Sequence, residues 1–396
     1  MPRHGFLKSI RLDGFLSFPP GSAPIDLEPL NVIIGPNGGG KSNLIEAIEL
    51  LHAAPTAFAN AIRDGGGPRE WLWKGDPTPQ SAEIDVVIHT DRFISDLRHQ
   101  LSFAASGART EILNEAIEEP NPRYDNQVDV FFYYRYQEGR PALNVRTTEG
   151  KQERRALRRE DLKPDESVLS QRKDPESYPE VTWLGEQYRL IQIFREWSIG
   201  RHVSLRQPQP ADLPSSPLLA DSRNLGLLLN EIEHSNAGAE FNRLLALFMP
   251  RYAHFSTRVQ GGTVQFYLHE KGLKAPIPAT RLSDGTIRFM AILALLLDPS
   301  PPPLTCIEEP ELGLHPDAVS ILADLFMEAS ERTQLIVTTH SDELISGLSD
   351  QPQAVLTCEY RNGTVLERVD PESLASWLEK YRLGELWRIG ELGGNP

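Results

Sequence analysis

A glycine-rich segment carries the residues of this chain best suited to hold a phosphate group. It fits the pattern G-x-x-x-x-G-K-[ST] directly after an apolar run, and its residues are Gly35, Pro36, Asn37, Gly38, Gly39, Gly40, Lys41 and Ser42. Gly35 and Gly40 let the backbone curl until successive N–H groups converge on one phosphate, while Lys41 adds a positive charge and Ser42 a hydroxyl for Mg²⁺. The spacing predicts a strand that ends at Ile34 and a helix over 41–51 whose positive end faces the phosphate.

Two adjacent carboxylates, Glu308 and Glu309, follow a second apolar run at 304–307. Glu308 can hold the hydration shell of Mg²⁺, and Glu309 can orient or deprotonate a water molecule that attacks a phosphate. Acidic loop residues are common and mostly solvated, so the pair alone is weak support. Together with the phosphate-binding pattern it predicts a magnesium-nucleotide site.

Two further segments could face the same anion. The apolar run 335–339 ends at His340, and ligands of open α/β sheets bind at the carboxyl ends of the strands. His340 is therefore predicted to contact the terminal phosphate, with a purely structural histidine as the alternative. Ser283 precedes an apolar run at 287–297, so it can cap a helix there while the free N–H groups of that helix face an anion.

The rest of the pattern predicts a chain that mixes strands and helices. Strands are expected where β-branched and aromatic residues gather, at 6–18, 82–89, 128–136 and 142–147, with a hairpin over 251–268. Apolar spacings of three and four predict helices over 180–197 and 224–247, separated by a proline-rich loop. From residue 282 onward helix and strand alternate, which is typical of a parallel sheet.

The composition is that of a globular protein without a disulfide framework. Of the 396 residues 40% are hydrophobic and 24% charged, and Cys306 and Cys358 have neither the number nor the spacing of a disulfide or zinc site. The formal net charge of -15 argues against a protein that coats nucleic acid through bulk electrostatics. A basic stretch at 151–159 is expected to be solvated surface, with a nucleic-acid contact as the alternative. No signal peptide or membrane span is expected, so a cytoplasmic protein without a membrane partner is predicted.

Taken together, the segments resemble the ATP-binding-cassette ATPases, specifically the compact RecF-like and SMC-like heads without long coiled-coil arms. Residues 35–43, GPNGGGKSN, look like the Walker A motif, and LSDGT at 282–286 looks like the signature motif. LTCIEEPE at 304–311 looks like Walker B, the following LGLHP like the D-loop, and His340 like the switch histidine. Gln171 is similar to the Q-loop glutamine, although a loop glutamine is often an ordinary surface residue.

The resemblance implies an α/β fold, namely an ABC-type P-loop ATPase head with a mixed sheet, an antiparallel β subdomain and a helical lobe. It divides the chain into an N-terminal ATPase lobe at 1–150, an inserted Q-loop and helical lobe at 151–280, and a C-terminal ATPase lobe at 281–396.

The resemblance also implies ATP and Mg²⁺ as cofactors. Asn43 then joins residues 35–42 at the nucleotide, and Ser283 and Gly285 face the γ-phosphate that Lys41 of a second subunit holds, so an ATP-dependent homodimer is expected. Catalysis falls to Glu309, His340 and Gln171, and the metal to Ser42, Glu308 and Gln171. Glu308 replaces the aspartate of many relatives, and Asp284 replaces a glycine of the transporter signature, which leaves the rate of hydrolysis open.

Two functional interpretations remain. The first is an ATP-driven switch in DNA repair, DNA maintenance or defence against foreign DNA, with dimerisation as its output. The second, prompted by the acidic charge, is a nucleotide-gated regulatory or scaffold subunit for a separate effector protein, without direct DNA binding. A transporter subunit fits the signature less well, and residues 341–396 are too few for an appended nuclease domain, so no nuclease activity is expected.

Overall fold

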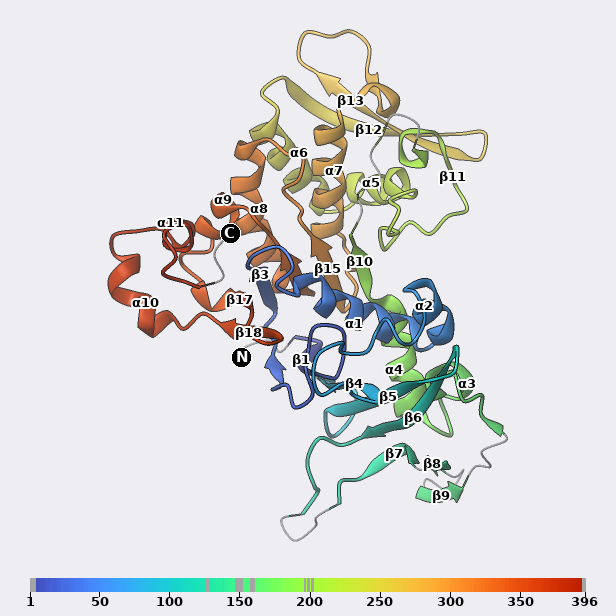
Figure 1. The fold of residues 1–396 in the computed structure, drawn as a ribbon. Coiled ribbons are helices and arrows are strands. Elements are labelled where there is room, and N and C mark those ends of the chain that lie inside the picture. Colours follow the sequence, from blue (N-terminus) through green and yellow to red (C-terminus); the bar gives the residue numbers. More distant parts are fainter. Residues whose placement is uncertain are drawn as a thin grey trace. The chain divides into compact units, whose positions relative to one another are not determined.

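The structure, a computed structural model, describes residues 5–124, 129–137, 139–146, 152–156, 161–195, 197, 200 and 203–393 (Figure 1). Contacts divide the chain into two compact units. Unit 1 comprises Met1–Ile191 and Leu356–Arg368, and unit 2 comprises Gln192–Val355 and Val369–Asn395. The division into three segments expected from the sequence stays a prediction.

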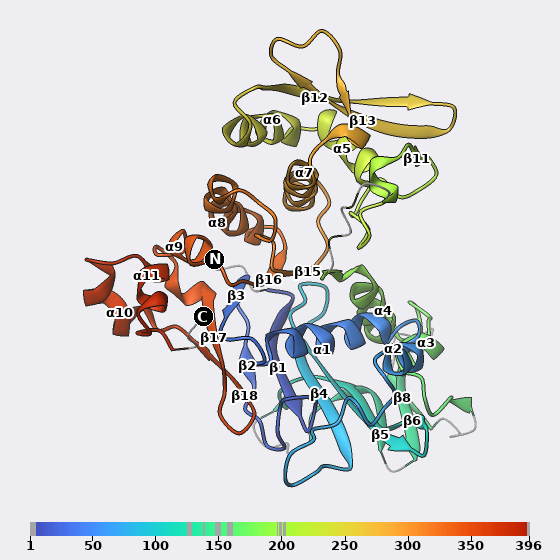
Figure 2. The ribbon, with the colours of Figure 1, turned by 45° about the horizontal axis from the view of Figure 1, so that its top comes forward.

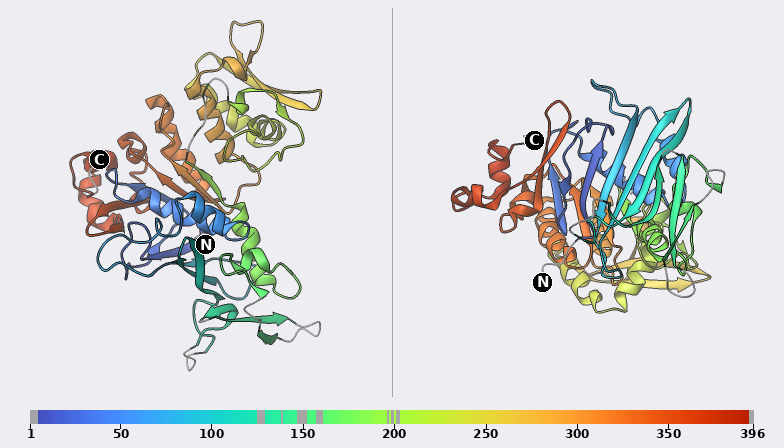
Figure 3. Two further views of the ribbon diagram at one scale, coloured as in Figure 1. Left: turned by 45° about the vertical axis from the view of Figure 1, so that its right-hand side comes forward. Right: turned by 90° about the horizontal axis from the view of Figure 1, so that it is seen from below.

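An antiparallel sheet forms the larger part of unit 1. Its strand order is β2-β1-β4-β5-β6-β7-β8-β9, and the strands lie side by side in the right-hand view of Figure 3. The bounds are β1 (Leu7–Asp13), β2 (Ile25–Asp26), β4 (Ser81–Ile88), β5 (Leu97–Ser106), β6 (Arg109–Glu118), β7 (Phe132–Gln137), β8 (Arg140–Arg146) and β9 (Gln152–Ala156). The basic stretch at 151–159 falls on β9 and on residues outside the described ones, so its role stays a prediction.

Helices cover one face of this sheet. They are α1 (Lys41–Ala53), α2 (Phe58–Asp64), α3 (Val168–Gln171) and α4 (Pro179–Leu190). Phe58 of α2 contacts Phe103 of β5 edge to face, and the Tyr188 hydroxyl of α4 lies 3.1 Å from Nδ1 of His99, also on β5. Because His99 and Phe103 are four residues apart on one strand, they share a face, and α2 and α4 therefore pack on the same side.

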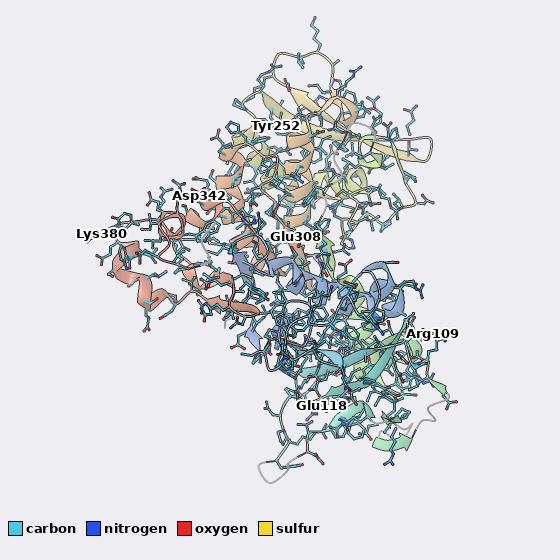
Figure 4. The ribbon with its side chains drawn as sticks, in the orientation of Figure 1. Arg109, Glu118, Tyr252, Glu308, Asp342 and Lys380 are labelled. Carbon is cyan, nitrogen blue, oxygen red and sulfur yellow. The ribbon has the colours of Figure 1, made fainter. Side chains whose placement is uncertain are left out.

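The opposite face of the sheet carries charged side chains. Asp85 of β4 accepts hydrogen bonds from Arg98 of β5 and Arg11 of β1, and Glu118 at the end of β6 binds Arg135 of β7 at 2.8 Å. Figure 4 labels Glu118, with Arg109 at the other end of the same strand. Burial alone would raise the pKa of Asp85, but the bonds and charges of Arg98 and Arg11 outweigh it and hold the pKa below its usual value.

Unit 1 also contains the strands that flank the glycine-rich loop. Strand β3 (Leu30–Ile34) is buried along its whole length, as expected for a strand of a covered sheet, and it has β17 (Val355–Tyr360) as a neighbour. Strand β18 (Thr364–Arg368) pairs antiparallel with β17. The turn between them contains Asn362 and Gly363, both at positive φ, which is the hairpin turn that Asn-Gly favours.

Unit 2 contains a parallel group of strands with helices between them. Strand β15 (Leu304–Glu308) pairs in parallel with β10 (Gln192–Phe194) and with β16 (Gln334–Thr338). Helices α7 (Asp284–Leu296) and α8 (Pro316–Ser330) lie side by side in Figure 2. The C-terminal helices of this unit are α9 (Asp342–Ser346), α10 (Pro371–Leu378) and α11 (Leu383–Arg388).

A smaller sheet with two helices completes unit 2. The strands are β11 (Gln209–Pro210), β12 (Tyr252–Gln260), β13 (Thr263–Glu270) and β14 (Ile277–Pro278), and the helices are α5 (Leu225–Glu233) and α6 (Ala237–Phe248). Phe241 of α6 packs against Phe255 of β12, and Phe248 packs against Phe289 of α7. Aromatic contacts thus join this sheet to the helix that begins after Ser283.

The expected fold class is confirmed, and the hairpin around Gly261-Gly262 forms as predicted. The helix predicted over 180–197 is wrong beyond Leu190, because Ile191 leaves helical geometry (φ -56°, ψ 134°) and 192–194 pair with β15. The helix predicted over 224–247 forms as two helices, because α5 ends at Glu233 and α6 begins at Ala237. The two helices approach closely, and a Cβ on Gly238 of α6 would lie 2.8 Å from the Ile232 carbonyl oxygen of α5. Strands β5, β6, β17 and β18 were not predicted.

Candidate active site

The glycine-rich loop joins β3 to α1, and α1 begins at Lys41 as predicted. Gly35, Gly38 and Gly40 have φ of 147°, 78° and 107°, a region that side chains other than glycine rarely adopt. Lys41 is buried, and its Nζ donates to the carbonyls of Gly35 at 2.6 Å and Pro36 at 3.0 Å. The loop therefore curls around the ammonium group of Lys41.

The β17–β18 hairpin packs against this loop. A Cβ on Gly35 would lie 2.1 Å from the Cys358 carbonyl oxygen, and a Cβ on Gly40 would lie 1.9 Å from Thr364 Oγ1. Thr364 Oγ1 donates to the Gly39 carbonyl at 2.8 Å, and Cys358 Sγ lies 3.3 Å from the same oxygen. Glycine is thus required at Gly35 and Gly40 by close approach as well as by backbone conformation.

The residues of this loop fit a nucleotide phosphate. The N-cap of α1 is Gly40, which has no side chain to cap the helix, and the positive end of a helix favours an anion. A Cβ on Gly38 would meet nothing within 4 Å, and Ser42 is exposed in the first turn. Lys41 would pair with phosphate oxygens and Ser42 would hold Mg²⁺, the roles that this pattern serves in general.

In unit 2, Glu308 ends β15, where Figure 4 labels it. Its Oε2 lies 3.4 Å from Nε of Arg195, the residue directly after β10. Its Oε1 is buried and accepts no hydrogen bond from any described residue. A buried carboxylate oxygen without a donor fits a cation or its water shell, so Glu308 suits the role predicted for it.

Glu309 adopts a conformation that is costly for a residue other than glycine. Its φ is 45°, and its N–H donates to the Thr338 carbonyl at 3.0 Å, which fixes this turn to the end of β16. Its Oε1 lies 3.6 Å from Nε2 of His340, too far for a hydrogen bond but close enough for an ion pair with a protonated imidazole. The structure brings Glu309 and His340 together, and strain of this kind gathers at functional sites.

Glu311 connects the loops after β15 and β16. Its Oε1 accepts from Thr339 Oγ1 at 2.7 Å and from the backbone N–H of His340 at 2.8 Å. Its Oε2 is buried and has no hydrogen-bond partner within the described residues. Glu311 therefore positions the backbone that carries His340.

The turn before α7 is held by a buried arginine. Ser283 caps α7 as predicted, accepting from the Thr286 N–H at 3.1 Å. Arg206, 3% exposed, donates to the carbonyls of Ala279 at 3.3 Å and Leu282 at 2.6 Å, and it pairs with the Asp284 carboxylate. The carboxylate of Asp284, which stands where the transporter signature has glycine, is thus paired with the positive charge of Arg206.

Gly285 lies beside the loop that follows β15. A Cβ on Gly285 would stand 2.9 Å from the Gly313 carbonyl oxygen. Gly285, Gly313 and Arg288 also border a cavity of about 230 Å³. Burial lowers the pKa of Arg288, and the charge of Glu311 opposes that shift.

Gln171 ends α3 in unit 1, and its side-chain amide forms hydrogen bonds with backbone groups of the loop before that helix. Its Oε1 accepts from the Lys163 N–H and its Nε2 donates to the Glu166 carbonyl, both at 2.7 Å. In unit 2 the residue that follows the strand beside β15 is Arg195, not a glutamine. The metal and catalytic roles of Gln171 stay predictions.

The predicted residues are thus distributed over both units. Residues 35–43 and Gln171 belong to unit 1, whereas Ser283, Gly285, Glu308, Glu309 and His340 belong to unit 2. Their convergence on one triphosphate stays a prediction. Sequence reasoning missed Arg195, Arg206, Glu311 and Thr364, of which only Glu311 stands inside a recognised motif.

The fold is that of P-loop ATPase heads of the ABC and SMC type. The sequence profile of the family described as "AAA domain, putative AbiEii toxin, Type IV TA system" matches residues 30–346, and the chain belongs to this family. No curated protein sequence matches the chain. Within the described residues, no helix is both long enough and apolar enough to cross a bilayer.

Solved structures of SMC heads share the fold at low identity. An SMC head bound to the C-winged helix domain of ScpA aligns with a TM-score of 0.59 and 14% identity, over 93% of this chain and 99% of that one. The SMC head of Pyrococcus furiosus, which has an extended coiled coil and is bound to the C-terminal domain of ScpA, gives 0.56 and 14% over 96% and 99%. At this identity the likeness concerns the fold alone.

Proposed function

We propose that this chain binds ATP with Mg²⁺ and hydrolyses the γ-phosphate, and that the bound nucleotide joins two copies of the chain. The observation that carries the proposal is the glycine loop curled around the buried ammonium of Lys41 at the positive end of α1. Such a loop suits a polyphosphate, because it offers backbone N–H groups, a fixed dipole and a cation at one place.

The residues of unit 2 supply what hydrolysis needs. Mg²⁺, when bound with the nucleotide, neutralises charge that develops on the phosphates. Glu308 has a carboxylate oxygen free to face the metal's water shell, and Glu309 orients the attacking water. His340 stands next to Glu309, where it can donate a hydrogen bond to the γ-phosphate.

Dimerisation follows from the turn before α7, which offers a second helix N-terminus for the same phosphate. Ser283 and Gly285 belong to this turn, and enclosure of ATP between two copies would exclude water from the site. The dimer would act as a switch in DNA repair, DNA maintenance or defence against foreign DNA, in the cytoplasm.

The test is the molecular mass in solution with and without Mg-ATP. Glu309→Gln should retain ATP and accumulate as a dimer, because it binds nucleotide but no longer activates water. Lys41→Ala should stay monomeric and bind ATP at least about tenfold more weakly, since a hydrogen bond to a charged group contributes about 1.5–3 kcal/mol. Glu328→Gln, on the exposed side of α8, is the matched control and should behave as wild type. A Glu309→Gln protein that remains monomeric at saturating ATP would contradict the dimer.

A second candidate function is a nucleotide-gated scaffold for a separate effector protein. The net charge of -15 favours it, because an acidic chain gains little from phosphate contacts. Two SMC heads of similar fold were solved bound to a domain of ScpA, a protein partner.

DNA binding separates the two candidates. The Glu309→Gln protein with Mg-ATP should be retained on single- or double-stranded DNA at low salt and released as salt rises. Lys41→Ala provides the nucleotide-free control. Absence of ATP-dependent retention on either DNA at every salt concentration would leave the scaffold as the better function.

A further inference from the structure

Thr364, far from the glycine loop in sequence, lies directly against it in space. It belongs to β18 and is 5% exposed. Its Oγ1 lies 2.8 Å from the Gly39 carbonyl oxygen and 2.6 Å from Ser17 Oγ. Ser17 Oγ in turn lies 2.6 Å from Nδ2 of Asn43, in the first turn of α1.

The direction of these hydrogen bonds is fixed by chemistry. A carbonyl can only accept, so Thr364 donates its single hydroxyl proton to Gly39. Thr364 must then accept from Ser17, whose own oxygen accepts from the amide of Asn43. The result is one chain of donors, from Asn43 through Ser17 and Thr364 to Gly39, in which each bond polarises the next.

This chain sets the orientation of one peptide group of the loop. The bond between Gly39 and Gly40 is trans, so its C=O and N–H point in opposite directions. With the carbonyl held by the β17–β18 hairpin, the Gly40 N–H points away from the hairpin. Gly40 directly precedes Lys41, whose ammonium lies inside the loop on the carbonyls of Gly35 and Pro36.

We infer that Thr364 is a positioning residue for the phosphate loop, holding the Gly39–Gly40 peptide so that the Gly40 N–H faces a bound phosphate. Cys358 assists from the same hairpin, with Sγ 3.3 Å from the same carbonyl. Burial raises the pKa of Cys358 to about 11, although Lys41 opposes the shift, so the thiol keeps its proton at neutral pH. This inference rests on the proposed ATP binding and adds a residue outside the glycine-rich pattern at 35–42.

The hairpin offers its own matched control. Thr357 of β17 is also buried, and its Oγ1 donates to the Glu367 carbonyl at 3.1 Å, inside the hairpin. Thr357→Val and Thr364→Val each remove one hydroxyl and keep a β-branched strand residue of the same shape. They differ in whether the lost bond reaches the glycine loop.

The experiment measures the affinity of each variant for ATP with Mg²⁺, using the full chain, and its melting temperature without nucleotide. We expect Thr364→Val to bind ATP about tenfold more weakly, whereas Thr364→Ser, which keeps the hydroxyl, restores the wild-type affinity. Both valine variants should lower the melting temperature by similar amounts, because each loses one buried hydrogen bond. Thr357→Val should nevertheless leave the affinity for ATP unchanged.

The outcomes distinguish this inference from the function on which it rests. If wild type binds ATP and Thr364→Val binds it equally well, the positioning role is overturned and the proposed function stands. The same holds if both valine variants lose affinity in proportion to their melting temperatures, because the role is then merely structural. A wild-type chain that does not bind ATP overturns both.

Discussion

The glycine loop of unit 1 and the turn before α7 in unit 2 present helix N-termini in different ways. The loop is held by its own glycines at positive φ, by the ammonium group of Lys41 on the carbonyls of Gly35 and Pro36, and by a chain of hydroxyls that ends on the Gly39 carbonyl. The turn is held instead by one arginine that is distant in sequence, because Arg206 binds two of its carbonyls and the carboxylate of Asp284. The two sites are predicted to bind the same phosphate, and different substitutions should therefore impair each of them.

The largest effect is expected from a side chain added to the loop. Gly40→Ala places a Cβ 1.9 Å from Thr364 Oγ1 at a φ of 107°, so the loop must move. Backbone strain alone costs about 1–3 kcal/mol, so ATP affinity should fall at least about tenfold.

Titration of ATP with Mg²⁺ into the purified variant measures this effect. Gly107→Ala is the control, because Gly107 also has positive φ (66°) but its Cβ would meet nothing within 4 Å. An unchanged ATP affinity in Gly40→Ala would contradict this prediction, because the loop would then accommodate a Cβ despite its close approach to Thr364.

A smaller and differently located effect is expected from Arg206→Met. The variant keeps the length of the buried side chain but leaves the carbonyls of Ala279 and Leu282 without their donor, at about 1–3 kcal/mol. Hydrolysis should fall roughly tenfold, while the affinity of the monomer for ATP stays unchanged, because the glycine loop is intact.

Steady-state hydrolysis and ATP binding, measured on the same preparation, separate these two quantities. Arg223→Met, at an exposed arginine paired with Asp221, is the matched control. Equal losses of affinity and hydrolysis in Arg206→Met would remove the distinction between the two regions.

The smallest effect on nucleotide function is expected from the charged face of the antiparallel sheet. Since Arg98 and Arg11 hold the pKa of Asp85 low in the folded chain, this carboxylate stabilises the fold above its unfolded pKa of about 3.9. The stabilisation is lost as pH falls from there through the lowered folded value.

Asp85→Asn should therefore lower stability at pH 7 by about 1 kcal/mol, a difference that shrinks below pH 4, with unchanged ATP affinity. Urea unfolding at several pH values measures it, with the exposed Asp64→Asn as control. A difference independent of pH would contradict the role of the Asp85 charge.

The sequence was most informative where backbone chemistry decides the structure locally. The start of α1 at Lys41, the cap at Ser283 and the hairpin at Gly261-Gly262 were all predicted, because glycine, serine and short turns act within a few residues. Strand β15 ends at Glu308, as the apolar run indicated.

Strands that depend on partners distant in the sequence were not predicted. Residues 192–194 form a strand because β15 lies beside them, although their spacing fits the preceding helix. Strand β5 was overlooked because a buried polar residue, His99, interrupts its apolar alternation. The Asn362-Gly363 pair was a usable signal for the β17–β18 hairpin.

The missed site residues share one cause. Arg195 and Arg206 follow no spacing rule, and their partners Glu308 and Asp284 lie about 80 to 110 positions further along the chain. A buried arginine is informative only once the carbonyls and carboxylates around it are known.

The pairing of Arg206 with Asp284 also has an evolutionary consequence. A mutation of Asp284 alone leaves the charge of Arg206 without its carboxylate, and a mutation of Arg206 alone leaves that carboxylate and two carbonyls without a donor. A joint exchange, of Asp284 to glycine and of Arg206 to a neutral side chain that still donates to the carbonyls, avoids both costs. The two positions should therefore change together across the lineage of this chain, with arginine retained wherever the aspartate is kept.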